Sequence, residues 1–495
     1  MQKVLKPSLL TASIMLSVFS SQAHATNGYA SHGFGTVQKA MGGAAVARHD
    51  NAMNMATNPA SMSFGKNNWT AGVDIFVPDR GMNHSGRTAL PDIPLANFFP
   101  PGTPLPAGAI VPASPAIQGV SLRGNDDSNF VIPEFAYQRH LNDKFAVGLA
   151  VYGNGGMNAT YDKPIFGPRN NPDGSPINPD GSAVGKNTGI DFAQLFVSPT
   201  VSMKLNEKNS IGASLNLVYQ RFKINGVKAF SPLSSDPSSL SDNGYASSTG
   251  LGINLGWQGK INDRLSAGAA YRSKTHMSEF DKYKGLFAEQ GDFDIPSMIT
   301  AGVSFQATPK TTVAFDVARI NYTDVKSISN KNNTAANQSH LIGSGFGVIP
   351  PGTPFPEPLL GADGGAGFGW EDQTVFKLGV KHQLNNKLAL MAGFNHADAP
   401  IPEEETAFNV LAPAAVEDHL TLGLDYKLNK NSNLSFQYMH AFNNEIKGDA
   451  SRQPNGAPVS GGAQVGIGAN PLTDFTAANI DMKQDSFGLS YSRDF

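Results

Sequence analysis

The side chains that could carry out chemistry in this chain of 495 residues are not arranged for catalysis. There is no cysteine, and neither the G-x-S-x-G pattern of a nucleophile elbow nor the H-E-x-x-H pattern of a zinc hydrolase occurs. Two Asn-Pro-Asp-Gly-Ser segments contain Asp173 and Asp180, but too few oxygen ligands accompany them for a Ca²⁺ site, so we interpret both as turns. The sequence predicts no enzyme, no metal site and no cofactor.

A second group of chemically useful residues is apolar and lies in two proline-rich segments. The pentapeptide Pro-Pro-Gly-Thr-Pro occurs in both 97–106 and 348–356. Proline keeps such loops semi-rigid, and their apolar side chains could either capture a hydrophobic ligand or pack against one another. The candidate substrate-binding residues are Phe98, Phe99, Leu105, Ile349, Phe355 and Leu359.

Alternation of apolar and polar residues indicates the elements that must position these loops. Between 420 and 428, leucine or tyrosine stands at every second position, and Thr, Gly, Asp and Lys stand between them. Alternate side chains of a strand point to opposite faces, so one face suits lipid and the other suits a polar interior. Similar runs recur along the chain.

Short polar turns join successive strands on one side, and longer connections join them on the other. This asymmetry is typical of an all-β, transmembrane antiparallel β-barrel, here of fourteen strands, or of sixteen if a hairpin is hidden in the long loops. The predicted strands are 68–78, 129–140, 145–161, 188–204, 210–226, 244–260, 265–282, 292–307, 311–327, 372–383, 387–399, 417–427, 433–446 and 480–495.

The N-terminus predicts export. Residues 1–25 have the form of a secretory signal peptide, in which Lys3 and Lys6 precede a short apolar run and Ala23-His24-Ala25 forms the cleavage site. No later segment has 18 consecutive apolar residues, but a closed barrel also satisfies every backbone group in lipid. The net charge of −3 gives no basic surface for nucleic acid.

Residues 26–66 do not alternate, whereas the predicted barrel covers 67–495. The segment is rich in small residues and is either a soluble periplasmic tail or a plug (hatch) inside the barrel. At the other end, 486–495 alternates to a terminal phenylalanine and looks like the C-terminal strand that the barrel-assembly machinery reads. These features predict a multi-pass protein of the bacterial outer membrane.

Several short segments carry a resemblance to a known family. Asn58-Pro59-Ala60 follows a small-residue stretch that contains Gly42 and Gly43. Further along come Tyr271-Arg-Ser273, Ile295-Pro296, Asn321-Tyr-Thr-Asp324 and 393–402, in which Ala399 and Ile401 replace the family's Ser and Val. In this order they resemble the long-chain fatty-acid outer-membrane transporter family, which also includes aromatic-hydrocarbon uptake channels.

The resemblance implies a fourteen-stranded barrel plugged by an N-terminal hatch, with an inward kink of the third strand through which substrate leaves sideways into the membrane. The candidate kink comprises Gly153, Asn154, Gly155 and Gly156, because glycine weakens strand pairing and permits a bend. The alternative is a loop that starts early. Within the hatch, Asn58, Pro59 and Ala60 could either hold a segment that moves or only anchor the plug.

The sequence therefore predicts a passive outer-membrane channel for hydrophobic compounds, in particular long-chain fatty acids. Lys228, just past a strand, could turn inward to pair with a carboxylate. The alternatives are a hydrophilic porin, which the polar residues Asp425 and Lys427 fit equally well, and an adhesin with long loops. Expected partners are hydrophobic small molecules, outer-membrane lipid, lipopolysaccharide and the barrel-assembly machinery; the chain is expected to be a monomer that binds no nucleic acid.

Overall fold

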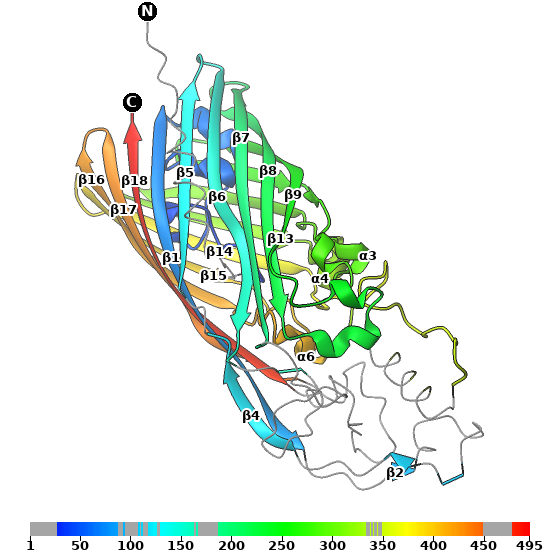
Figure 1. The fold of residues 1–495 in the computed structure, drawn as a ribbon. Coiled ribbons are helices and arrows are strands. Elements are labelled where there is room, and N and C mark those ends of the chain that lie inside the picture. The colour runs from blue at the N-terminus through cyan, green and yellow to red at the C-terminus, as the bar shows by residue number, and fades with distance from the viewer. Residues whose placement is uncertain are drawn as a thin grey trace, which may run out of the picture.

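The chain forms a closed antiparallel β-barrel whose wall has fourteen strands (Figure 1). The computed structural model describes residues 27–87, 93–94, 107–108, 110–111, 117–125, 129–162, 165–166, 187–332, 337, 340, 344, 349–448 and 478–495. In order around the ring, the wall strands are β1 (Asn68–Arg87), β5 (Phe130–His140), β6 (Phe145–Thr160), β7 (Gly189–Lys204), β8 (Asn209–Asn225), β9 (Ala246–Lys260), β10 (Leu265–Arg272), β12 (Met298–Thr308), β13 (Thr311–Ile320), β14 (Gln373–Gln383), β15 (Leu388–His396), β16 (Asp418–Asn429), β17 (Ser432–Ile446) and β18 (Asn479–Asp494).

Pairing of β18 with β1 closes the ring. Two short strands extend the sheet without entering the ring: β4 (Ile117–Arg123) pairs with the far end of β1, and β11 (His276–Met277) pairs with β9. A separate pair is formed by β2 (Ile93–Pro94) and β3 (Ile110–Val111). The predicted fourteen-stranded wall is confirmed, and the alternative of sixteen wall strands is wrong.

The two faces of each strand behave as the alternation predicts. In β16, Leu420 and Leu422 are exposed on the outer face, whereas His419 and Thr421 are fully buried on the inner face. A slip of one residue would reverse every side chain, so the burial of one face fixes the register of the wall.

The short turns lie at the same end of the barrel as the C-terminus (Figure 1). In four of them an asparagine side chain accepts hydrogen bonds from the backbone N–H groups two and three residues later, at Asn142, Asn206, Asn262 and Asn385. Such local bonds are the reason that asparagine favours tight turns. By the usual asymmetry of these barrels, this is the periplasmic end.

Aromatic side chains gather on the adjacent strands β18, β1 and β5 near the periplasmic end. The rings of Trp69 and Tyr491 lie 5.3 Å apart, and those of Tyr137 and Phe495 lie 5.6 Å apart. Amphipathic rings favour the boundary between hydrocarbon and headgroups, so they mark the edge of the membrane. No helix among the described residues is long and apolar enough to span a bilayer.

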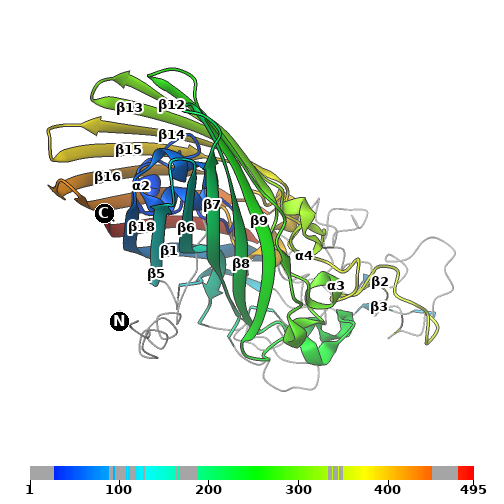
Figure 2. The same ribbon diagram turned by 90° about the horizontal axis from the view of Figure 1, so that it is seen from above.

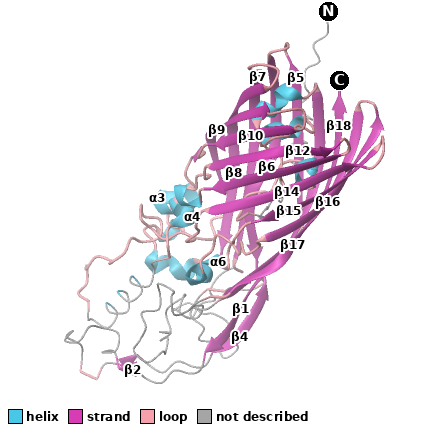
Figure 3. Cartoon of the chain, turned by 180° about the vertical axis from the view of Figure 1, so that it is seen from behind, coloured by secondary structure: helices cyan, strands magenta, loops and turns pink. Residues whose placement is uncertain are grey.

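Residues 27–66, called here the N-terminal segment, lie within the ring of strands (Figure 2). The segment contains α2 (Thr36–Lys39), η1 (Ala52–Ala56) and η2 (Pro59–Phe64). Other short helices gather at the opposite end, as the cyan elements of Figure 3 show. These are η4 (Lys228–Leu233), η5 (Pro237–Ser239), η6 (Asp281–Tyr283), α3 (Ala288–Gly291), η7 (Tyr322–Asp324), α4 (Lys326–Ser329), η8 (Glu403–Glu405) and α6 (Thr406–Asn409).

Candidate functional site

The N-terminal segment rests on glycines of the barrel wall. A Cβ added to Gly393 would lie 2.1 Å from the backbone nitrogen of Gly42, and one added to Gly379 would lie 2.5 Å from the carbonyl oxygen of Met41. Gly42 and Gly43 have φ of +64° and +83°, a conformation that other residues rarely adopt. The backbone of the segment therefore approaches the wall more closely than any larger side chain would permit.

Asn58 fastens a second part of the segment to the wall. Its side-chain nitrogen donates to the carbonyl oxygens of Val46, at 2.7 Å, and Trp257, at 2.9 Å. Its side-chain oxygen accepts from the backbone nitrogen of Ala60 and caps η2, which begins with Pro59. Asn58 is fully buried, so its bonds are made where water cannot replace them. This geometry is that of an anchor.

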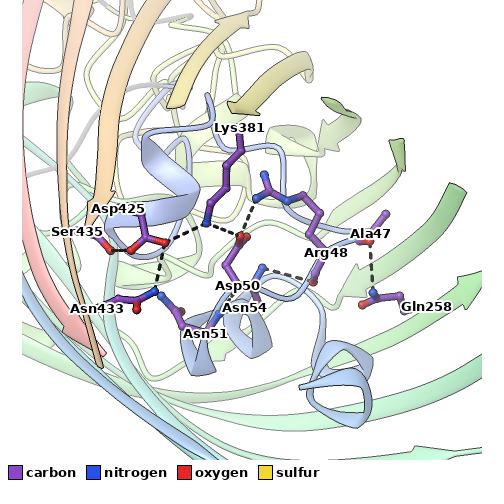
Figure 4. A network of polar contacts seen from close by, with 10 residues as sticks. All are labelled: Ala47, Arg48, Asp50, Asn51, Asn54, Gln258, Lys381, Asp425, Asn433 and Ser435. Carbon is purple, nitrogen blue, oxygen red and sulfur yellow. Dashed lines mark hydrogen bonds and ion pairs between the residues drawn. The ribbon is translucent and has the colours of Figure 1, made fainter. Parts of the chain in front are cut away.

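Charged side chains connect the segment to the wall inside the barrel. Lys39 forms a buried ion pair with Asp74 of β1. Asp50 lies 2.7 Å from Arg48 and 3.4 Å from Lys381 of β14 (Figure 4). Burial raises the pKa of Asp50, but Arg48 and Lys381 outweigh that effect and hold the pKa at about 2.

The same Lys381 also contacts Asp425 of β16 at 3.1 Å (Figure 4). Elsewhere on the wall, the carboxylate of Asp316 accepts hydrogen bonds from the backbone nitrogens of Ala45, at 2.7 Å, and Val46, at 2.9 Å. Asp316 and Lys381 therefore contact the segment directly. The inward Asp425 is paired within the wall, with Lys381, Asn433 and Ser435.

Strand β6 leaves the plane of the wall over Tyr152–Ala159, called here the β6 kink. Its side chains alternate in exposure up to Val151, but all eight residues of the kink are buried. Pairing with β5 ends at Phe135 and Val151, although β5 continues to pair with β1 down to Phe130. The β5–β6 ladder is therefore interrupted beside the kink.

The kink contains the four predicted residues and contacts the start of the N-terminal segment. The register with β7 shifts between Gly153 and Gly155, which leaves Asn154 as the inserted residue. The backbone nitrogen of Gly156 donates to Tyr29 at 3.1 Å, and that of Ser31 donates to Asn154 at 2.9 Å. A Cβ on Gly155 would lie 2.0 Å from the carbonyl oxygen of Tyr29, so this contact requires glycine.

Aromatic side chains fill the lumen on the far side of the segment. Tyr29 lies at ring distances of 5.9 Å from Phe192, 5.5 Å from Tyr322 and 6.0 Å from Trp370. All four are buried, in one apolar cluster with further phenylalanines of the loops. This part of the lumen is therefore suited to hydrophobic solutes and poorly suited to hydrated ones.

A small cavity of about 20 Å³ lies between the kink, β1 and this cluster. Arg80 of β1, which is fully buried, contributes the only charged side chain to its described lining. The guanidinium donates to the carbonyl oxygen of Pro78 at 3.1 Å and to the side chain of Asn158. The other lining residues are Gly28, Phe76, Gly156, Met157, Trp370, Ala412, Pro413, Ala414 and Met482.

The predicted loop residues are only partly described. Phe98, Phe99 and Leu105 lie outside the described residues. Ile349, Phe355 and Leu359 are partly buried, and the ring of Phe355 packs 4.9 Å from that of His340. Lys228 is exposed at the start of η4.

Sequence reasoning missed Arg80, the aromatic cluster and the glycines beneath the N-terminal segment. Two signals were present in the sequence. In β8 the inward positions change from Ser210 and Ser214 to Phe222, which indicates a polar lower lumen and an apolar upper one. Pro133 in β5 faces the interrupted ladder, and a proline within a strand is tolerated where pairing is incomplete.

Comparisons with known proteins agree with this architecture. The chain is similar to the toluene transporter TodX of P. putida (TM-score 0.59, 16% identity, 94% of this chain and 99% of that chain). It is also similar to the toluene transporter TbuX of Ralstonia pickettii (TM-score 0.55, 17% identity, 94% and 99%) and to a Pseudomonas aeruginosa FadL homologue (TM-score 0.59, 16% identity, 94% and 100%). No curated protein matches the sequence.

At these identities the structural likeness concerns the fold alone. The sequence model of a family described as outer membrane protein transport protein (OMPP1/FadL/TodX), however, matches residues 14–466. Since that match spans most of the chain, this protein belongs to the OMPP1/FadL/TodX family of outer-membrane transport proteins.

Proposed function

We propose that this outer-membrane channel for hydrophobic compounds transports long-chain fatty acids by passive diffusion. Apolar extracellular loops capture the substrate, the start of the N-terminal segment moves, and the substrate leaves sideways beside the β6 kink. The observation that carries the choice of a fatty acid is the position of Arg80, whose buried guanidinium lies beside Asn158 in a mostly apolar cavity next to the kink.

The chemistry of that cavity fits a molecule with one anionic end. A guanidinium presents several N–H donors in a plane and binds a carboxylate through paired hydrogen bonds. Phe76, Met157 and Met482 surround it with apolar surface. A hydrocarbon chain gains about 25 cal/mol for each Å² that it removes from water, and the carboxylate fixes its orientation.

The cavity holds space for about one water molecule, so a fatty acid enters only if part of its wall moves. Gly28 belongs to that wall and lies at the start of the N-terminal segment. The remainder of the segment is anchored by the buried pair Lys39–Asp74 and by Asn58. We therefore place the movement in residues 27–34 and keep the rest of the hatch fixed.

The interrupted β5–β6 ladder supports a lateral exit. Backbone groups of the kink that do not bond to β5 bond instead to Tyr29 and Ser31. Displacement of residues 27–34 would free both the cavity and the kink, which couples substrate binding to opening. The anchored segment argues against a steady aqueous pore and hence against a hydrophilic porin.

A monoaromatic hydrocarbon is the second candidate substrate. The aromatic cluster around Tyr29, Phe192 and Trp370 offers rings for edge-to-face contacts, and two solved structures similar in fold are described as toluene transporters. A monoaromatic hydrocarbon offers Arg80 no hydrogen-bond acceptor, only the face of its ring for a weaker cation–π contact. The two candidates therefore differ in their dependence on this arginine.

Uptake by cells that express Arg80→Leu separates them. Labelled oleate uptake should fall about tenfold or more, as expected when a hydrogen bond to a charged group is lost, whereas toluene uptake should not fall. Arg80→Lys should retain part of the oleate uptake, and Arg123→Leu, at an exposed arginine, serves as the control. Unchanged oleate uptake by an assembled Arg80→Leu barrel would contradict the proposal.

A further inference from the structure

The loop between β10 and β12 folds back into the upper lumen from a base that is fixed to the wall. Thr275 and Ile295 exchange backbone hydrogen bonds of 2.9 and 3.1 Å, and Met277 pairs with β9. Asp294 also accepts from the backbone nitrogen of Met277, at 2.7 Å. Residues 280–291, beyond this base, are called here the strap; they contain η6 and α3, at the end opposite the short turns (Figure 3).

Aromatic side chains of the strap fill part of the upper lumen. Phe280, Tyr283 and Phe287 are buried, and each lies in the apolar cluster that contains Tyr29. Their ring centres lie 5.5, 4.8 and 4.7 Å from that of Phe222, an inward residue of β8. The strap therefore occupies space in the lumen between the extracellular loops and the N-terminal segment.

The tip of the strap has a strained backbone. Glu289 and Gln290 have φ of +56° and +54°, in the left-handed region where Cβ lies too close to the following carbonyl oxygen. Each such residue disfavours its conformation by about tenfold. Asp242 is the one other described non-glycine residue with a positive φ, and it has no strained neighbour. Two consecutive strained residues therefore distinguish the strap from every other described segment, and strain of this kind persists only where surrounding contacts impose it.

A neighbouring loop imposes the strained conformation. The backbone nitrogen of Glu289 donates to the carbonyl oxygen of Ala362 at 3.2 Å. That of Gln290 donates to Gly361 at 2.9 Å, and its side chain donates to Asp363 at 2.8 Å. This loop follows directly on the second proline-rich segment, so movement of that segment acts on the tip of the strap.

We propose that the strap is the extracellular gate of the channel and that its strained tip sets how often the gate opens. A hydrophobic molecule bound at the second proline-rich segment would displace the loop that holds Glu289 and Gln290. The tip would then relax to ordinary backbone, and Phe287 would withdraw from the lumen. The release step rests on the proposed capture of substrate by that segment; the strain-controlled opening does not.

Opposing contributions to its free energy suit the strap to act as a gate. Burial of three aromatic rings favours the closed position. The two strained residues together oppose it by about a hundredfold. A ligand shifts an equilibrium only by its differential affinity for the two states, so a gate needs an open state that lies within that reach. Without the strain, the same burial would keep the strap closed.

Thiol labelling of the purified barrel measures the opening without any substrate. Ala288 is fully buried beside the strained residues, and the chain has no cysteine, so Ala288→Cys supplies the only thiol. A maleimide reagent reaches this thiol only when the strap opens. In that background, Gln290→Gly should be labelled several-fold more slowly than Gln290→Ala, because both lose the side-chain contact with Asp363 and only glycine relieves the strain.

Asp242 supplies the matched control, because its positive φ lies outside the strap. In the same background, Asp242→Gly and Asp242→Ala should be labelled at equal rates. Glu289→Gly and Glu289→Ala repeat the comparison at the second strained residue if a variant of Gln290 fails to assemble. Equal labelling of the glycine and alanine variants within the strap, or an equal difference at Asp242, would overturn the proposal.

Uptake by cells connects the opening of the strap with transport. With Ala288 restored, Gln290→Gly should take up labelled oleate or toluene, whichever the unmodified channel transports, several-fold more slowly than Gln290→Ala. Slower labelling without slower uptake would also overturn the proposal, because the strap would then move without being the gate. A failure of the fatty-acid assignment is distinguishable, since it changes which compound is taken up and leaves the labelling rates as expected.

Discussion

Arg272 donates from its Nη1 to the side-chain oxygen of Asn154 at 2.6 Å, so a buried residue of β10 holds the inserted residue of the β6 kink. The same guanidinium lies 6.0 Å from the ring of Phe34 in the N-terminal segment and 5.6 Å from that of Phe196 in β7. The side chain of Arg272 thus contacts the β6 kink, the N-terminal segment and the barrel wall.

Removal of that side chain should loosen the kink. In Arg272→Met the side chain of Asn154 loses a charge-assisted hydrogen bond worth about 1.5–3 kcal/mol, which favours the opened state by tenfold or more. Planar-bilayer recordings should therefore show more frequent brief openings than the unmodified protein gives. Arg319→Met, which lies on the outer face, should leave the recordings unchanged.

Gly393 should tolerate no side chain. A Cβ at this position collides with the backbone of Gly42, whereas the nearest atoms to a Cβ at the inward Gly488 belong to the side chain of Gln437 and not to backbone. We expect Gly393→Ala to displace the N-terminal segment. The free energy of unfolding should fall by about 1–3 kcal/mol, measured as a lower urea midpoint. Gly488→Ala is the matched control, and trypsin cleavage within 27–66 should increase only in Gly393→Ala.

The effects of substituting Asp50 and Lys381 on the free energy of unfolding should not be additive. Asp50→Asn removes a partner of two mostly buried cations and should cost about 2 kcal/mol in the free energy of unfolding. The double variant Asp50→Asn/Lys381→Met should recover part of that loss, because it leaves fewer uncompensated charges. Strict additivity of the two single changes in urea unfolding would show that this contact does not stabilise the barrel.

Acid should lower the free energy of unfolding within a defined range of pH, because of histidines in the N-terminal segment. Burial lowers the pKa of His49 to about 4, whereas in an unfolded chain histidine titrates near pH 6.5. Between these values the unfolded chain binds more protons, so stability falls as pH decreases from 6.5 to 4. Burial also lowers the pKa of His32, which adds to the same window.

His49→Gln should therefore flatten part of the decrease between pH 6.5 and 4, measured as the urea midpoint at each pH. The pKa of Asp50 falls from 3.8 to about 2, so its stabilising effect is lost only at lower pH, between these two values. Asp50→Asn should keep the upper window and extend it to lower pH, because the charge of Asp50 raises the pKa of His49 against the effect of burial. A pH profile of His49→Gln that is identical to that of the unmodified protein would contradict this assignment.

The wall could be predicted from the sequence because one buried face imposes a period of two on every strand. Some of the predicted strand ends were wrong. The strand expected at 265–282 stops at Arg272, because the chain then turns inward and buries Phe280 and Phe287 in the lumen. The strand expected at 68–78 continues to Arg87, where β4 pairs with it.

The candidate site could be predicted only in part. The sequence placed Gly153, Gly155 and Gly156 close together and left a bend or an early loop open, and the structure adds that Gly155 accommodates Tyr29. Arg80 could not be assigned from sequence, because its cavity joins β1 to Trp370 and Met482, which are distant along the chain. No pattern within a short stretch of sequence predicts contacts between residues so far apart along the chain.

A reversible crosslink between β5 and β6 tests the proposal that hydrophobic substrate leaves through the gap between these strands. Continued beyond the pair Phe135–Val151, the antiparallel register would place Pro133 opposite Gly153. The chain has no cysteine, so Pro133→Cys/Gly153→Cys adds the only thiols. Oxidation should close the gap.

The measurement is labelled oleate uptake by cells with the crosslinked barrel, with the disulfide verified by mass spectrometry. If substrate leaves sideways, uptake should fall to the level of cells without the channel and return on reduction. Uptake by the fully crosslinked protein at the rate of its reduced form would contradict lateral exit.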